Sequence, residues 1–182
     1  MSYLLTTPRL AFREMTRDDL TFLAKMTGDP EVMRYFPEPL RSQGPEAWLE
    51  RQLSRYARDG HGAWLVLDRK SGEPLGQAGL IRQEVEGEPV MEIGYMFHRP
   101  FWRRGYASEA AAAIRDQAFG ERGLDEVVSL IVADNEPSIG VARKIGMSPR
   151  RELDFHGLRH VLFGLTRAEL AGAQPPRQAP RP

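Results

Sequence analysis

The stretch FWRRGYASEA, residues 101–110, places Arg103, Arg104 and Gly105 immediately before an alanine-rich run with helical spacing. A helix N-terminus carries four unpaired N–H groups and about half a positive charge, and Ser, Thr, Asp or Asn usually caps it. Here two cations and a glycine occupy that place. Such a site can bind an anion with several acceptor oxygens, and pyrophosphate is the commonest such ligand. The alternative is that Glu109, in the first turn, compensates the helix dipole while both arginines point into solvent.

Two well-known phosphate-binding loops do not occur in the sequence. A Walker loop requires G-x-x-x-x-G-K-[ST], and a dinucleotide-binding fingerprint requires G-x-G-x-x-G after the first strand of a βαβ unit. A diphosphate at residues 103–108 must therefore be held in another way.

A second polar pair, Asn135 and Ser138, lies where a strand is predicted to end and a short helix to begin. By local chemistry alone, these residues are typical of a turn and a helix cap.

Composition limits the classes of function. The chain has 182 residues, which suits one domain. It has 25 Lys plus Arg and 25 Asp plus Glu, so no overall basic field would attract nucleic acid or an anionic membrane. The absence of cysteine excludes disulfides, a Cys-ligated zinc and a thiol nucleophile. The N-terminus does not resemble a signal peptide and no apolar run is long enough for a membrane span, so a cytoplasmic location is expected.

The elements that must position these residues alternate between short strands and amphipathic helices, which predicts a mixed α/β fold. The predicted helices are a first one beginning at TRDDLTFLAKM, a second from about Gly44 to Arg58, a third over 106–119 and a short one within 136–146. The predicted strands are 9–14, 63–68, 74–83, 90–97, 125–132, 148–155 and 159–166.

The last twelve residues differ in composition from the rest. AGAQPPRQAPRP, from Ala171 onward, is rich in proline, alanine and arginine. We expect a domain over residues 1–170 and a disordered or extended tail over 171–182 without a catalytic role.

Five segments, in order, resemble one family: TPRLAFREMTRDDL, DPEVMRYFP, EIGYMFHRPFWRRGYASEA, VADNEPSIGVARKIGM and LRHVLFGLTRAEL. They resemble the GNAT superfamily of acetyl-CoA-dependent N-acetyltransferases, in the branch of ribosomal-protein N-terminal (RimJ/RimL-type) acetyltransferases. The family loop is usually written [QR]-x-x-G-x-[GA]. This chain has Trp102 in the first position and keeps Gly105 and Ala107.

The resemblance implies a GNAT fold, with a mixed, mostly antiparallel, splayed sheet of about seven strands and about four helices. The strands EIGYMF and DEVVSLIV would part at their ends so that the pantetheine arm of acetyl-CoA enters the gap. Gly105 would allow close approach of the phosphates. The implied cofactor-binding residues are Met96 and Phe97 for the pantetheine amides, Arg103, Arg104, Gly105, Tyr106, Ala107 and Ser108 for the pyrophosphate, and Asn135, Ser138, Ala142 and Lys144 along the cofactor.

The implied reaction is direct attack of a primary amine on the thioester, without a metal. Glu92 lies on the same face of its strand as Gly94 and Met96 and is the best-placed carboxylate to take the proton through water. A solvated strand residue is the alternative reading of Glu92, and the alternative bases are His98, His156 and His160. Ser138 could protonate the leaving thiolate, although a thiolate of pKa about 8.5 to 9 needs little help near neutral pH.

The acceptor stays open between a protein N-terminus and a small-molecule amine. Tyr35, Phe36, Trp48 and Tyr56 could wall its groove, although most of them are typical of core. Arg159 and Phe163 replace an aspartate and a tyrosine common in the family's last strand. We expect no nucleic-acid or membrane partner and either a monomer or a homodimer. A non-catalytic acyl-CoA-binding domain and a nucleotide-binding protein are the alternatives.

Overall fold

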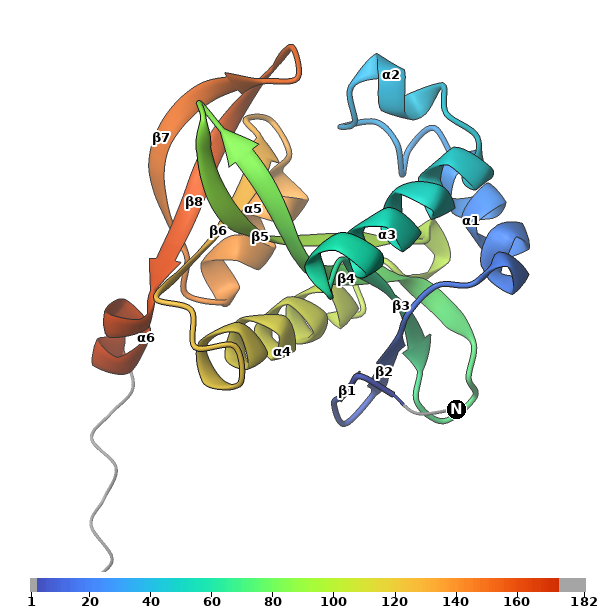
Figure 1. Cartoon of the computed structure of the whole chain (residues 1–182), viewed down its shortest axis with the longest axis horizontal. Helices are drawn as coiled ribbons and strands as arrows, with labels where there is room; N and C mark the ends of the chain where they lie inside the picture. The colour runs from blue at the N-terminus through green and yellow to red at the C-terminus, as the bar shows by residue number, and fades with distance from the viewer. Residues whose placement is uncertain (1–2, 174–182) are drawn as a thin grey trace, which may run out of the picture.

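The computed structural model describes residues 3–173. In this part of the chain, eight strands form a single sheet in the order β1-β2-β3-β4-β5-β6-β8-β7 (Figure 1). All neighbouring strands are antiparallel except β5 and β6, which are parallel. The strands are β1 (Leu5–Thr6), β2 (Leu10–Arg13), β3 (Ala63–Asp68), β4 (Pro74–Val85), β5 (Glu88–Phe97), β6 (Glu126–Val132), β7 (Ser148–Phe155) and β8 (Leu158–Thr166).

Helices cover both faces of this sheet. Within residues 3–173 they are α1 (Leu20–Thr27), α2 (Glu38–Arg41), α3 (Pro45–Asp59), α4 (Tyr106–Gly120), α5 (Glu136–Lys144) and α6 (Arg167–Ala173), with 3₁₀ turns η1 (Arg17–Asp19) and η2 (Arg99–Phe101). The alternation along β3 shows the two faces. Trp64 and Val66 pack with α4 and α5, whereas Leu65 and Leu67 pack with α1 and α3.

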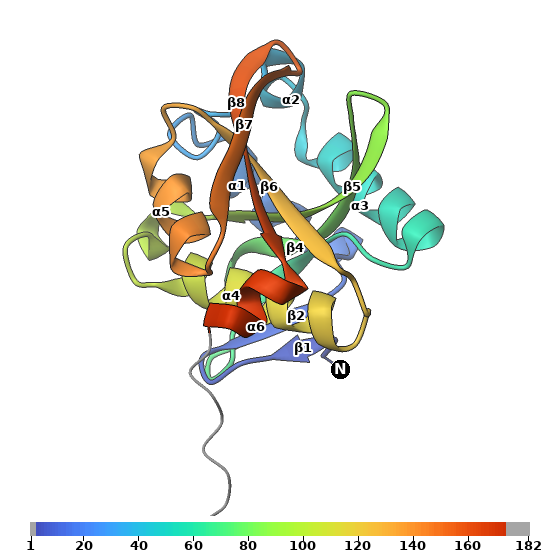
Figure 2. The same ribbon diagram turned by 90° about the vertical axis from the view of Figure 1, so that its left-hand side faces the viewer.

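The sheet splits between β5 and β6. These strands are paired only at Glu92 and Val128, and beyond that point they run apart towards α5 (Figure 2). One edge of β5 from Ile93 to Phe97 therefore has no strand partner. The predicted splay between these two strands is confirmed.

The mixed α/β fold with a mostly antiparallel sheet is confirmed, and all seven predicted strands and four predicted helices are present. The two-residue β1 and the four-residue α2 were not predicted, because elements this short leave no periodic pattern. Helix α6 was also missed, although Thr166 and Glu169 form a capping box there: Glu169 N donates to Thr166 Oγ1 at 3.2 Å, and Thr166 N to Glu169 Oε2 at 2.7 Å.

The boundary of the predicted tail was wrong by at least three residues. Ala171 to Ala173 belong to α6 instead of to an irregular tail. The rest of the predicted tail, residues 174–182, lies outside the described residues.

Candidate active site

The N-terminus of α4 presents open backbone donors. Gly105 precedes the helix with a φ of +79°, and Arg103 has a φ of +60°, so the chain turns through the left-handed region twice before the helix begins. Within the described part of the chain, no side chain caps α4. Among residues 3–173, the N–H groups of Tyr106, Ala107 and Ser108 have no acceptor, and Glu109 N is the first to bond, to Gly105 O at 3.1 Å. Three convergent N–H groups are thus available to an anionic ligand.

The two arginines before α4 are exposed. Neither Arg103 nor Arg104 forms an ion pair with another residue of the described part of the chain, and the Arg104 guanidinium lies 5.8 Å from the ring centroid of Phe101. Their positive charge is uncompensated there. This leaves both free to contribute to anion binding.

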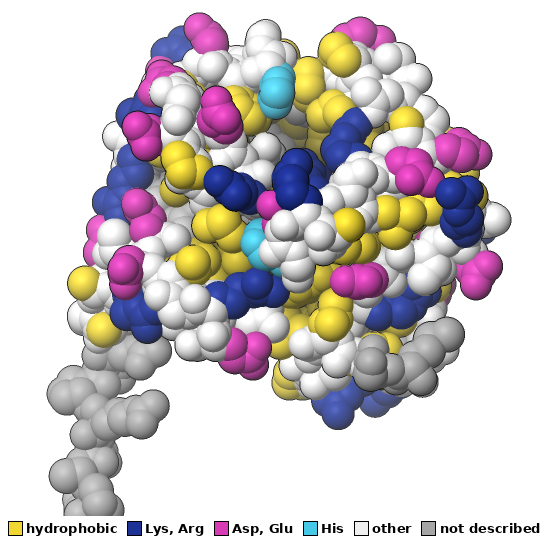
Figure 3. Space-filling model, viewed as in Figure 1, with side chains coloured by type: hydrophobic (Ala, Val, Ile, Leu, Met, Phe, Trp, Pro, Cys, Tyr) yellow, Lys and Arg dark blue, Asp and Glu magenta, His cyan; other side chains and the backbone are white. Residues whose placement is uncertain are grey.

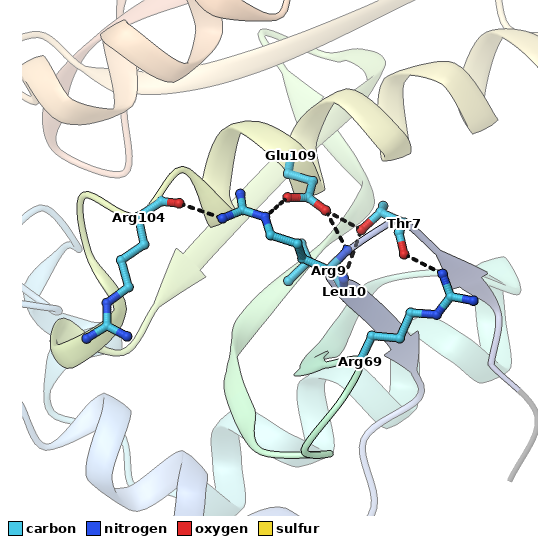
Figure 4. Close-up of polar contacts among 6 residues, drawn as sticks. All are labelled: Thr7, Arg9, Leu10, Arg69, Arg104 and Glu109. Carbon is cyan, nitrogen blue, oxygen red and sulfur yellow. Dashed lines mark hydrogen bonds and ion pairs between the residues drawn. The ribbon is translucent and has the colours of Figure 1, made fainter.

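Glu109 does not serve as the free counter-charge of the helix dipole. Its carboxylate accepts hydrogen bonds from Arg9 Nε at 2.5 Å, Thr7 Oγ1 at 2.6 Å and Arg9 N at 3.0 Å (Figure 4). Burial opposes ionisation of Glu109, but the hydrogen bonds from Thr7 and Arg9 outweigh it and hold its pKa below the ordinary value. The alternative reading of this first turn is therefore wrong in part, because Arg9 already neutralises the carboxylate.

Arg9 also fixes the loop before α4. Its Nη1 donates to Arg104 O at 2.9 Å, and its guanidinium lies 4.7 Å from the ring centroid of Tyr106. Figure 4 shows the chain of contacts from Arg69 through Thr7 and Glu109 to Arg104. Arg9 was not predicted as a site residue, since nothing local to residue 9 indicates a partner about a hundred residues away.

The open edge of β5 is already partly occupied by side chains. Ser129 Oγ donates to Ile93 O at 2.8 Å, and Trp102 Nε1 donates to Phe97 O at 2.6 Å. The Phe97 carbonyl, expected to be free for pantetheine, therefore has a donor already, although a carbonyl has a second lone pair. Met96 is buried on the α1 and α3 face and is paired with Gln77 of β4.

Glu92 lies at the point where β5 and β6 part. Its carboxylate accepts from Gln83 Nε2 at 2.9 Å and, more weakly, from the backbone N–H of Leu130 on β6 at 3.4 Å. Burial raises the pKa of Glu92 above the ordinary value, and the hydrogen bonds from Gln83 and Leu130 and the positive charge of Arg55 only partly offset it. This side chain is half-buried and hydrogen-bonded, which favours a positioned carboxylate over a freely solvated strand residue.

Asn135 and Ser138 form the N-terminus of α5. Asn135 Oδ1 accepts from Ser138 N at 3.2 Å, which confirms the cap predicted from local chemistry. Across the gap, the Tyr95 hydroxyl of β5 donates to Ser138 O at 3.0 Å. This bond connects the open edge of β5 to α5. Farther along α5, Ala142 is fully buried in the core and Lys144 is exposed.

The three candidate histidines lie in different environments. His98 makes edge contacts with Phe22 and Phe101, at centroid distances of 5.9 and 6.0 Å. His156 is exposed at the β7–β8 turn. His160 is buried with Nδ1 2.8 Å from Leu158 O, and burial lowers its pKa. Unlike these histidines, Glu92 on β5 accepts a hydrogen bond from β6 at the point where the two strands part.

The residues considered as a wall for the acceptor are mostly structural. The Tyr56 hydroxyl donates to Ala63 O, and Trp48 Nε1 donates to Gln77 Oε1 at 2.9 Å, so both anchor α3 to the sheet. Phe36 packs against Trp48 and Tyr35 is half-buried. On β8, Arg159 pairs with Glu152, and Phe163 is buried.

Residues 3–173 contain no helix long and apolar enough to cross a bilayer. They also contain no group of three or more His, Asp or Glu residues placed to hold a metal ion.

The sequence is similar to those of known proteins. The acetyltransferase (GNAT) domain matches residues 9–148. An uncharacterized protein of Bacillus subtilis strain 168, YkkB, is 40% identical over 144 residues, which are 79% of this chain and 84% of YkkB. The uncharacterized N-acetyltransferase YnaD of the same organism is 32% identical over 149 residues, 81% of this chain and 83% of YnaD.

Solved structures share the fold. An acetyltransferase of Agrobacterium tumefaciens strain C58 superposes with a TM-score of 0.76 at 26% identity, covering 92% of this chain and 95% of its own. Two other structures share the fold alone. One is a RimL ribosomal L7/L12 α-N-protein acetyltransferase in complex with coenzyme A, with a TM-score of 0.73 at 13% identity, covering 91% of this chain and 98% of its own. The other is a Vibrio cholerae spermidine N-acetyltransferase in complex with coenzyme A and spermine, with a TM-score of 0.72 at 16% identity, covering 91% of this chain and 99% of its own.

The domain match spans most of the chain, and the splayed sheet and open α4 N-terminus agree with it. The chain belongs to the GNAT family of acetyltransferases.

Proposed function

We propose that the protein transfers an acetyl group from acetyl-CoA to a primary amine by direct attack in a ternary complex. The observation that carries this proposal is the opening of the sheet beside the uncapped N-terminus of α4. The pyrophosphate would accept from the N–H groups of Tyr106, Ala107 and Ser108, with Arg103 and Arg104 adding positive charge. The structure of RimL with coenzyme A supports this choice of co-substrate.

Glu92 is proposed as the general base. A primary amine must lose a proton to attack a thioester, and only about one lysine in 2500 is neutral at pH 7, against about one α-amine in ten. A carboxylate with a raised pKa is a better base near neutral pH than an ordinary one. The half-buried position of Glu92, where β5 and β6 part, fits this task through one bridging water.

The proposed step balances without a metal. The neutral amine nitrogen forms a bond to the thioester carbonyl carbon, its proton passes through water to Glu92, and the C–S bond breaks to release the thiolate of coenzyme A. Ser138 could protonate this sulfur, with Asn135, Ala142 and Lys144 along the pantetheine arm. A thiolate of pKa about 8.5 leaves readily without an acid, so we give Ser138 a minor part.

A thiol-release assay tests this function. Purified protein, acetyl-CoA and a panel of primary amines are expected to release thiol, and Glu92→Gln is expected to lower the rate while the affinity for acetyl-CoA stays constant. Glu84→Gln, at an exposed position of β4, is the matched control. Micromolar binding of acetyl-CoA without thiol release from any amine would favour the non-catalytic acyl-CoA-binding alternative instead.

A further inference from the structure

Arg51 and Arg55 form an unusual pair on α3. They are one turn apart and therefore lie on the same side of the helix, and both are partly buried. Burial lowers the pKa of both, and the charge of Arg51 lowers that of Arg55 further. Like charges at this spacing destabilise a helix by about 0.2–0.5 kcal/mol. The two like charges therefore oppose folding of the helix at this spacing.

Neither guanidinium has a carboxylate partner. Among residues 3–173, Arg51 donates to Gln43 Oε1 and Arg55 Nη1 donates to Gln52 Oε1 at 3.2 Å, and neither forms an ion pair. By contrast, the exposed Arg58 on the same helix pairs with Asp59 at 2.6 Å. Buried charges are normally the paired ones, so the usual distribution is reversed on this helix.

The pair lies on the same face of the sheet as Glu92. Helix α3 packs on the face of the sheet that carries Leu65 and Met96. Leu65 is paired with Gln77 and Gln77 with Met96, and Glu92 lies four residues before Met96 on β5, so its side chain points to this same face. Arg51 lies over the Trp48 ring at 5.4 Å, and Trp48 is itself bonded to the sheet. Figure 3 shows dark blue side chains gathered near the centre of the view, over α3 and the β4–β5 hairpin.

Arg55 and Glu92 do not neutralise one another. Arg55 acts on Glu92 through space, but no nitrogen–oxygen pair of the two lies within 4.0 Å, and burial still dominates the pKa of Glu92. A proton acceptor and two uncompensated cations thus lie on one face of the sheet. A substrate whose amine lies beside Glu92 can therefore place an anionic group beside Arg51 and Arg55.

We infer that the acceptor amine carries an anionic group, bound by Arg51 and Arg55 while its amine approaches Glu92. This inference rests on the proposed acetyl transfer and narrows its acceptor class. Paired guanidinium groups recognise a carboxylate or a phosphate through several charge-assisted hydrogen bonds, whereas they repel a polycation such as spermidine. The preferred acceptors are therefore amino acids, acidic N-termini or phosphorylated amines.

Paired amines that differ only in charge test the inference. One pair is β-alanine and β-alaninamide, and the other is O-phosphoethanolamine and ethanolamine, so the two arms distinguish carboxylate from phosphate. Wild-type protein should show a kcat/KM at least about tenfold higher for the anionic member of one pair, as loss of one charge-assisted contact would give. Arg51→Gln and Arg55→Gln should both abolish this preference mainly through KM. Arg51→Gln, whose charge does not act on Glu92, should leave the neutral amine almost unaffected.

The matched control is Arg58→Gln, which removes an exposed and already paired cation from the same helix. It should keep the preference. Equal use of charged and neutral amines by the wild type, or a preference that survives in both Arg51→Gln and Arg55→Gln, overturns the anion site while leaving acetyl transfer intact.

If no amine is acetylated, the proposed function fails and a binding measurement decides the anion site. A rise in the melting temperature of the coenzyme A complex with β-alanine or O-phosphoethanolamine, lost in Arg55→Gln but kept in Arg58→Gln, supports the site. No rise with either compound overturns it.

Discussion

Replacing Gly105 by Glu tests the anion site at α4 most directly. The position is exposed and has a φ of +79°, so any other residue pays about 1–2 kcal/mol for the left-handed conformation. A new Cβ would lie 3.4 Å from Arg9 Nη2, at the flexible end of a long side chain. The protein should therefore still fold. Gly105→Gln has the same strain and nearly the same bulk, so the difference between the two variants isolates the charge.

The expected size of the charge effect follows from Coulomb's law. One carboxylate about 5 Å from two phosphate charges costs about 1.7 kcal/mol in water and about 6.6 kcal/mol at an effective dielectric constant of about 20. The lower value applies at this exposed position, especially since Arg9, Arg103 and Arg104 would partly offset the new charge. Gly105→Glu should therefore bind coenzyme A up to about fifteenfold more weakly than Gly105→Gln.

Isothermal titration with coenzyme A measures this difference, and thermal unfolding of both variants checks that they fold. The difference in coenzyme A affinity between the two variants should narrow in about 1 M salt, where the Debye length falls to about 3 Å. A folded Gly105→Glu protein with the affinity of Gly105→Gln would refute the assignment of the pyrophosphate to this loop.

Three further changes test the rest of the site. Glu92→Gln should lower kcat by about 10²–10⁴-fold with acetyl-CoA affinity unchanged, and a loss of less than about threefold would assign the proton to another base. Burial raises the folded-state pKa of Glu92, so the free energy of unfolding of the wild type should fall relative to that of Glu92→Gln as the pH rises above about 4.3. Urea titrations from pH 4 to 8 measure this difference. A difference that does not change with pH would contradict the burial of the Glu92 charge. Ser138→Ala should lower kcat by less than about tenfold, whereas a hundredfold loss in stopped-flow thiol release would make Ser138 the acid. Arg9→Met should raise the KM for acetyl-CoA severalfold because the loop loses its bond at Arg104 O, and an unchanged KM would limit Arg9 to stability.

Features set by neighbours in the sequence were predicted well. The helix at α4 and the cap at Asn135 depend on residues at most four positions away. The strands of the β3–β5 meander were also found, because alternation and turn residues are local signals. Helix α6 was missed despite its local signal, the capping box of Thr166 and Glu169.

Features set by distant partners were not available from the sequence. The pairing of Arg9 with Glu109 spans 100 positions, and the contact of Tyr95 with Ser138 spans 43. Each joins elements whose mutual position depends on the whole sheet.

The sequence by itself determined where the uncapped N-terminus of α4 lies, since its N–H groups and its glycine lie within one turn of helix. Only the tertiary structure decided which charges are neutralised. Arg9 neutralises Glu109. Within the described residues, four arginines have no carboxylate partner: Arg103 and Arg104 before α4, and Arg51 and Arg55 on α3. A charge is compensated or left free by what packs against it in space. Sequence composition, with equal numbers of acids and bases, carries no trace of that choice.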